Sequence, residues 1–194
     1  QRNFWMLSTH LVPLLRKDEI EKGAEDLLLQ YCPTALTDYK EHNAYLLADK
    51  MGLHVEHLPL FHQQGTLSIL FFCVGTVQVA DDRQKSAYVS KVTIPAGTIV
   101  INTNAVHKDC CQMEIYHECI HYAWHYMFFR LQDMHNSDIN KLRTKHVVIT
   151  NGKVPANPLK WMEWQARRGS FGLMMPLGLM RSQIEKRLSD LHQR

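Results

Sequence analysis

The chain has 194 residues, of which 45% are hydrophobic and 21% are charged, and its formal net charge is +3 at pH 7. This composition is typical of one folded domain with a substantial core, and the small charge gives no reason to expect direct nucleic-acid binding. No apolar run is long enough to cross a membrane. Five cysteines without a regular spacing indicate a reducing compartment, so we expect a cytoplasmic protein.

The first half of the chain predicts two helices followed by strands. Residues 18–31 place their apolar side chains on one side of a helix, which Pro33 ends. A second helix over 43–50 is closed by Gly52. Apolar runs then predict strands over 53–60, 67–74, 76–80, 87–94 and 98–102. We expect the third of these strands to pair with the second one across Gly75.

A long buried helix is predicted after these strands. No Pro or Gly occurs within 105–131, and no charged residue lies between Glu118 and Arg130, so the run is apolar on nearly all sides. Asn102 or Asn104 is expected to cap the start of this helix, because asparagine is a preferred N-cap residue.

The connection after this helix, residues 132–156, is long. It includes a polar stretch and then Asn151-Gly152, which predicts a hairpin with a type I′ turn. Loops of this length are often functional, and we expect this one to border the cleft and restrict access to it. Asn157 and Pro158 then predict the start of another helix, with Asn as the cap and Pro at the first helical position.

Residues 117–121 have the sequence His-Glu-Cys-Ile-His. At ~100° per residue, His117, Glu118 and His121 face one side of a helix. Two imidazoles one turn apart can bind a single zinc ion, and the glutamate between them can take a proton from a water that the zinc activates. The alternative to a zinc site is a buried helix that contains two histidines by chance. The apolar surroundings favour the metal, because a buried Glu118 needs a charged partner.

Catalytic zinc usually has three protein ligands, so a third must come from elsewhere in the chain. His125 is too far away, because at ~1.5 Å rise per residue it lies about 12 Å from His117 along the helix axis. The remaining candidates are Asp133, His135, Asp138, His146 and Glu163. Glu163 has the best setting, in the second turn of the helix that starts at Pro158 and among apolar neighbours. An ordinary solvated glutamate is the alternative for this residue.

The segment 163–176 resembles the second motif of the ImmA/IrrE-type metallopeptidases. In that family a glutamate opens the pattern E-x-x-A-N-x-F-A-x-x-L-L-M-P. The positions in register with it are Glu163, Ala166, Leu173, Met175 and Pro176. The first motif of the family is a helix with HExxH, which His117, Glu118 and His121 match. The resemblance extends over roughly residues 40–176, in the order of elements as well as in the motifs.

Four features depart from the family pattern. Ile120 stands where the family usually has Gly, Arg167 where it has Asn, and Gly169 where an aromatic residue is common. The connection from His121 to Glu163 is also longer than is typical. These departures concern the surroundings of the motifs and the substrate. The two histidines of the first motif and the glutamate that opens the second are all present.

Strands packed against helices predict an α+β fold. The resemblance implies a minimal zincin-like metallopeptidase core, in which a small mixed sheet packs against the HExxH helix and flanking helices. We expect an N-terminal helical segment over 1–40, the metallopeptidase domain over 41–176, and a C-terminal helix over 177–194. Related proteins often continue with further helices, so this last part is expected to be truncated.

The resemblance also implies the site. His117, His121 and Glu163 would bind Zn²⁺, and Glu118 would be the catalytic general base. The expected function is that of a zinc metallopeptidase of the HExxH, gluzincin-like type. It would be an endopeptidase that hydrolyses one protein substrate, by resemblance a DNA-binding transcriptional repressor of a mobile element or stress regulon. The sequence does not predict the oligomeric state.

Two other classes of protein remain open. The first is a metal-bound regulatory or anti-repressor binding module with little proteolytic activity, but such a module would not need Glu118 as a base. The second is a structural zinc site or a non-peptidase hydrolase with the same pentapeptide, which the match over 163–176 disfavours.

Overall fold

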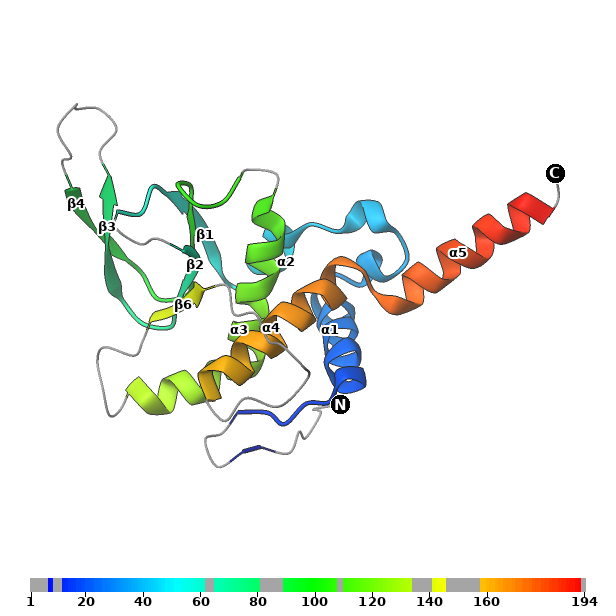
Figure 1. Cartoon of the computed structure of the whole chain (residues 1–194), viewed down its shortest axis with the longest axis horizontal. Coiled ribbons are helices and arrows are strands. Elements are labelled where there is room, and N and C mark those ends of the chain that lie inside the picture. Colours follow the sequence, from blue (N-terminus) through cyan, green and yellow to red (C-terminus); the bar gives the residue numbers. More distant parts are fainter. Residues whose placement is uncertain are drawn as a thin grey trace.

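The computed structural model describes residues 7–8, 12–61, 65–80, 89–107, 110–133, 141–145 and 158–192. Within these ranges the chain has an α+β fold (Figure 1). The helices are α1 (Lys17–Tyr31), α2 (Ala44–Lys50), α3 (Cys111–Asp133), α4 (Pro158–Met174) and α5 (Leu177–His192), with short 3₁₀ helices at Pro33–Leu36 and Tyr39–Glu41. The strands are β1 (His54–Leu58), β2 (Thr66–Phe71), β3 (Gly75–Ala80), β4 (Val89–Ile94), β5 (Thr98–Asn102) and β6 (Lys141–Lys145).

The larger sheet is mixed, with the strand order β1-β5-β2-β6. β1 and β5 are parallel, whereas β2 is antiparallel to both β5 and β6. Side chains of the central strands alternate between two faces. Leu70, Ile99 and Ile101 belong to the core shared with the helices, whereas Ile69 and Val100 pack with β3 and β4. Because both faces are covered, these strands have nearly continuous apolar sequences.

The pairing predicted across Gly75 is wrong. β3 does not pair with β2; it forms a separate two-stranded antiparallel sheet with β4, from Gly75 opposite Ile94 to Ala80 opposite Val89. The reason is that the hydrogen-bonding edges of β2 are already used by β5 and β6. The strands predicted over 53–60 and 67–74 are confirmed with bounds that differ by one to three residues. The strand over 98–102 is confirmed with its predicted bounds, as is the described part of the strand over 87–94, which begins at 89.

The expected cap of the long helix is also wrong. α3 begins at Cys111, and the Asn102 side chain is used elsewhere. Its Oδ1 accepts the N–H groups of Leu60 (3.2 Å) and Asn104 (3.1 Å), and its Nδ2 donates to the carbonyl of Thr66 (2.9 Å). Asn104 in turn donates to the carbonyl of Leu60 (3.2 Å). These bonds join the ends of three chain segments, so both side chains are used away from the helix.

The helices pack closely enough for two glycines to be required. α3 contacts both β2 and β5, and α4 packs against α3 and α1. A Cβ added to Gly172 would lie 2.9 Å from the Cβ of Ala24 on α1. A Cβ on Gly169 would lie 2.9 Å from Cδ1 of Ile120 on α3. Both glycines therefore allow α4 to approach its neighbours, and this approach brings Glu163 to α3.

The predicted helices over 18–31 and 43–50 are confirmed as α1 and α2, and Pro158 begins α4 as expected. β6 was not predicted as a strand. The hairpin predicted at Asn151-Gly152 lies outside the described residues, as does the expected cap Asn157. α5 extends away from the rest of the molecule (Figure 1), and Leu179 is its one buried side chain. None of the described helices has the length and apolar composition that a membrane span requires.

Candidate metal centre

Two helices bring three potential ligands together. His117 and His121 lie one turn apart on α3, and Glu163 lies on α4, which crosses α3 at this point. The three residues are 2%, 0% and 8% exposed, so the cluster is shielded from solvent. Within the described ranges it is the one group of three or more His, Cys, Asp or Glu side chains that could hold a metal ion.

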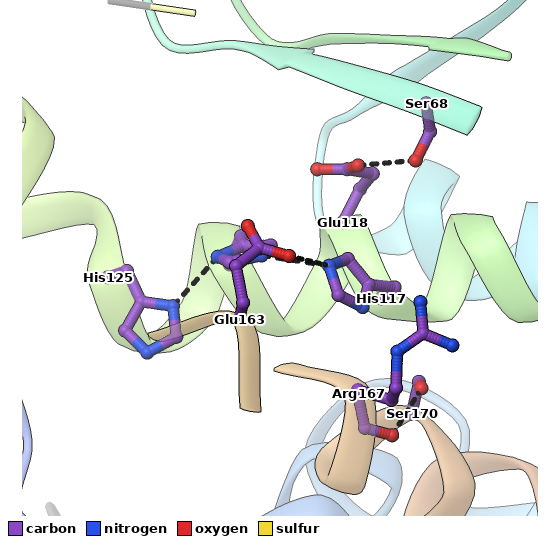
Figure 2. Close-up of polar contacts among 8 residues, drawn as sticks. Ser68, His117, Glu118, His125, Glu163, Arg167 and Ser170 are labelled. Carbon is purple, nitrogen blue, oxygen red and sulfur yellow. Dashed lines mark hydrogen bonds and ion pairs between the residues drawn. The ribbon is translucent and has the colours of Figure 1, made fainter. Parts of the chain in front are cut away.

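The distances within this cluster fit a tetrahedral metal site. The Nε2 atoms of His117 and His121 are 3.0 Å apart. Glu163 places Oε2 at 3.4 Å from Nε2 of His117 (Figure 2). Its Oε1 lies 3.4 Å from Nε2 of His121. Atoms bound at ~2.0–2.1 Å to one tetrahedral zinc ion lie roughly 3.3 Å from each other. Oε1 of Glu163 is buried and accepts no hydrogen bond, as expected of an atom arranged for a cation.

The other candidates for the third ligand do not enter this cluster. Asp133 is the last residue of α3, and its side chain is not described. His135, Asp138 and His146 lie outside the described residues. Glu163, which the sequence favoured by its setting and by resemblance, is the carboxylate that meets both histidines.

The electrostatics of the site favour the metal-binding forms of Glu163 and His121. Burial opposes ionisation of Glu163, but the interactions with His121 and His117 hold its pKa well below the usual range. Burial lowers the pKa of His121 to about 4, against the opposing effect of Glu163. Burial also acts to lower the pKa of His117, but the hydrogen bond with Glu163 and the charge of Glu118 outweigh it and raise this pKa. At pH 7 Glu163 is ionised and His121 is neutral.

Glu118 lies beside the cluster without belonging to it. The residue is fully buried, and its Oε1 accepts a hydrogen bond of 2.5 Å from Oγ of Ser68 on β2 (Figure 2). Its charge also acts on His117, which places the carboxylate close to the histidine pair. The sheet therefore holds this glutamate in one orientation next to the three potential ligands.

His125 is buried but lies outside the three-residue cluster, as its distance along the helix predicts. Its Nδ1 lies 2.9 Å from Nδ1 of His121, the ring nitrogen that does not face Glu163. Its Nε2 lies 2.8 Å from Oε1 of Gln165 on α4. Figure 2 shows His125 on the same helix as His117, beyond Glu163.

Sequence analysis missed three of these residues. Ser68 precedes Glu118 by 50 residues, and no sequence pattern joins them. Gln165 follows Glu163 by two positions, so helix periodicity alone places it on a different face. His125 lies four residues after His121, so helix geometry alone predicts that their side chains are neighbours. From the sequence we considered His125 only as a possible metal ligand.

Gly169 on α4 lies directly against α3. A Cβ on Gly169 would lie 2.9 Å from Cδ1 of Ile120 and 3.0 Å from Cη2 of Trp124. An aromatic residue at position 169 would therefore not fit while Ile120 is present.

Arg167 lies one turn beyond Glu163 on α4 (Figure 2). Its carbonyl accepts a hydrogen bond of 2.8 Å from Oγ of Ser170. The side chain of Arg167 is half-buried, so this end of the site has a cation close to the cluster in sequence.

Comparison with known proteins identifies no relative: neither a family model, nor a curated protein, nor a solved structure matches this chain.

Proposed function

We propose that this chain is a zinc-dependent endopeptidase with a zincin-like core. The observation that most supports this proposal is the buried cluster of His117, His121 and Glu163, whose separations fit tetrahedral zinc, with Glu118 beside it. Two nitrogens and one carboxylate oxygen form a ligand set that is typical of catalytic zinc, because it leaves a fourth position open. The resemblance to ImmA/IrrE-type metallopeptidases supports the same function, since both matched motifs contribute to this one cluster.

Each residue has a defined task in peptide hydrolysis. His117, His121 and Glu163 would hold the ion. Zinc bound there would polarise a scissile carbonyl and lower the pKa of a water molecule toward ~7. Glu118 takes the proton of the attacking water and later delivers it to the leaving amine. Ser68 donates to one oxygen of Glu118, which orients the carboxylate for this transfer.

The surroundings of Glu118 favour an enzyme over a binding module. A fully buried carboxylate is costly unless it is stabilised, and this one has a hydroxyl donor from the sheet. A module that only binds its partner through a metal site would gain nothing from this arrangement. Hydrolysis requires it, because a base must lie next to the ion and keep its orientation.

The connection between the two helices supports a selective peptidase. Its described part, β6, pairs with β2, the strand from which Ser68 contacts Glu118. The connection thus passes beside the proposed base, and we expect it to limit access. A substrate segment would add at the outer edge of β6 or take the place of β6 beside β2. By the family resemblance, the substrate would be a DNA-binding repressor.

The five cysteines are all thiols and form no disulfide, including the buried Cys111 and Cys119. Thiols in this number are typical of proteins in a reducing compartment, which supports the cytoplasm as the site of action.

Cleavage of a phage-displayed library of random peptides tests the proposed function. We expect the zinc-loaded protein to cut a small subset of the displayed peptides, with the activity lost on chelation and restored by zinc, while casein stays largely intact. Rapid digestion of casein would contradict the limited access. A zinc-loaded protein that cuts no displayed peptide would contradict the peptidase and favour the binding module.

A further inference from the structure

A buried row of polar groups leads from the cluster to the N-terminal segment. Nδ1 of His121 lies 2.9 Å from Nδ1 of His125, and Nε2 of His125 lies 2.8 Å from Oε1 of Gln165. The amide nitrogen of Gln165 donates to the backbone carbonyl of Pro13 at 2.6 Å. The three side chains are 0% exposed, so water does not compete for these bonds. Trp161 also donates to the Pro13 carbonyl, at 3.2 Å.

The carbonyl at the end of this row determines the direction of every hydrogen bond in it. A carbonyl can only accept, so Gln165 must present its NH₂ group to Pro13 and its oxygen to His125. Nε2 of His125 must then be the donor. His125 is 0% exposed, and its two hydrogen-bond partners, His121 and Gln165, carry no negative charge, so a buried imidazolium would be unpaired and the ring is neutral. Its Nδ1 is then an acceptor. The donor to that atom is therefore Nδ1–H of His121.

A neutral imidazole with its hydrogen on Nδ1 has a free lone pair on Nε2. In His121 this is the atom that faces Nε2 of His117 and the Glu163 carboxylate. The row thus leaves the lone pair at the point where a metal ligand is needed, whether or not an ion is bound.

We propose that His125 and Gln165 are positioning residues, which hold His121 in the tautomer that binds the metal and are themselves held by the carbonyl of Pro13. This inference rests on the proposed zinc site. It adds a function for two buried residues that lie outside the three-residue cluster. Partners of this kind typically change metal affinity by about 10- to 100-fold when they are removed.

Nitrogen NMR of the isotope-labelled, metal-free protein tests the tautomers directly and needs no substitution. We expect the ring hydrogen on Nδ1 in His121 and on Nε2 in His125. A ring hydrogen on Nε2 of His121 in the metal-free protein would overturn the inference. This measurement does not depend on zinc. It therefore tests the predicted directions of the hydrogen bonds separately from the proposed function.

Zinc affinity, measured by competition with a chelator, tests the positioning role. His125→Phe keeps the ring shape but removes both nitrogens, and we expect it to weaken zinc binding about 10- to 100-fold. His125→Gln restores an acceptor toward His121 and a donor toward Gln165, and we expect it to recover most of the affinity. His57→Phe, at an exposed histidine that contacts Tyr45, is the control and should have no effect.

Unchanged zinc affinity in His125→Phe would overturn the positioning role. Equal weakening of zinc binding in His125→Phe and His125→Gln would also overturn it, because the effect would then come from altered packing and not from the lost hydrogen bonds. A wild-type protein that binds no zinc would contradict the proposed metal site instead, while the tautomers would still be tested by NMR.

Discussion

Glu118 is the residue whose chemistry most clearly separates an enzyme from a metal-binding module. It is fully buried, Ser68 donates to its Oε1, and it is not one of the three clustered ligands. We expect Glu118→Gln to retain zinc and the fold, because the amide has nearly the same shape and its oxygen can still accept from Ser68. Peptide cleavage should fall by at least ~100-fold, since general-base catalysis typically contributes about that factor or more.

Undiminished cleavage by Glu118→Gln would contradict the role of this residue as the base. The zinc content of the variant, measured in the same preparation, shows whether any loss of activity comes from the missing base or from a missing ion.

Glu163 supplies the one negative charge among the three clustered ligands. Replacement by Gln keeps the size but removes the charge and presents an amide that can face the histidines with its NH₂ group. We therefore expect Glu163→Gln to lower zinc affinity by more than ~100-fold, beyond the effect typical of residues outside the ligand shell. Glu185→Gln, at an exposed position on α5, is the matched control and should leave the affinity unchanged. Equal affinities in the two variants would exclude Glu163 as a ligand.

At the scale of the elements, the contact between α3 and α4 decides whether the cluster can form. Gly169 faces Ile120 and Trp124, where an added Cβ would approach to 2.9–3.0 Å. Because Trp124 cannot easily move, we expect Gly169→Ala to reduce the free energy of unfolding by about 1–3 kcal/mol, despite the better helix propensity of Ala. Denaturant unfolding measures this change.

The double variant Ile120→Ala/Gly169→Ala tests whether Ile120 is the neighbour that crowds position 169. We expect its loss of stability to be smaller than the sum of the two single losses, because the smaller residue on α3 makes room for the methyl group. Gly178→Ala, where the nearest atom to the added Cβ is 3.8 Å away, is the control and should be neutral or slightly stabilising. Strict additivity of the two substitutions would contradict crowding by Ile120.

Local signals in the sequence were sufficient to predict the helices. Pro33, Gly52 and Pro158 mark helix bounds through backbone chemistry that does not depend on the rest of the fold. Strand pairing depends on which edges remain free, so the partner of β3 could not be predicted. The sequence of β6, Lys-Leu-Arg-Thr-Lys, has too few apolar residues to indicate a strand, although charged residues are typical of edge strands.

The site, like the fold, could be predicted only where local geometry determines it. His117 and His121 are four residues apart on one helix, so their proximity follows from helix geometry. Glu163 was favoured only by its setting and by resemblance, because its approach depends on how α4 packs against α3. Ser68 and Gln165 could not be predicted, since their contacts with Glu118 and His125 exist only after the sheet and α4 are in place.

At the scale of the whole molecule, the buried histidines make the stability of the metal-free protein depend on pH. The pKa of His121 is lowered from 6.5 to about 4, and that of His125 is also well below its usual value. Between pH 6.5 and 4 the unfolded chain therefore binds more protons than the folded protein, so stability falls as the pH decreases through this range. The pKa of His117 is raised, so its contribution changes only above pH 6.5 and does not offset this loss.

We expect the free energy of unfolding of the metal-free protein to fall by on the order of a few kcal/mol between pH 6.5 and pH 4. Denaturant unfolding at a series of pH values measures this change. His125→Gln, which removes one of the buried titrating groups, should flatten this dependence. Stability that is constant or that rises as the pH falls over this range would contradict the burial of neutral histidines at the site.

The central claim is that His117, His121 and Glu163 together bind one zinc ion. The most direct test is a crystal structure of the zinc-loaded protein with anomalous diffraction recorded at the zinc absorption edge. We expect one strong anomalous peak at ~2.0–2.1 Å from Nε2 of both histidines and from a carboxylate oxygen of Glu163. A peak bound by other side chains, or no peak between these three residues in protein saturated with zinc, would contradict the account.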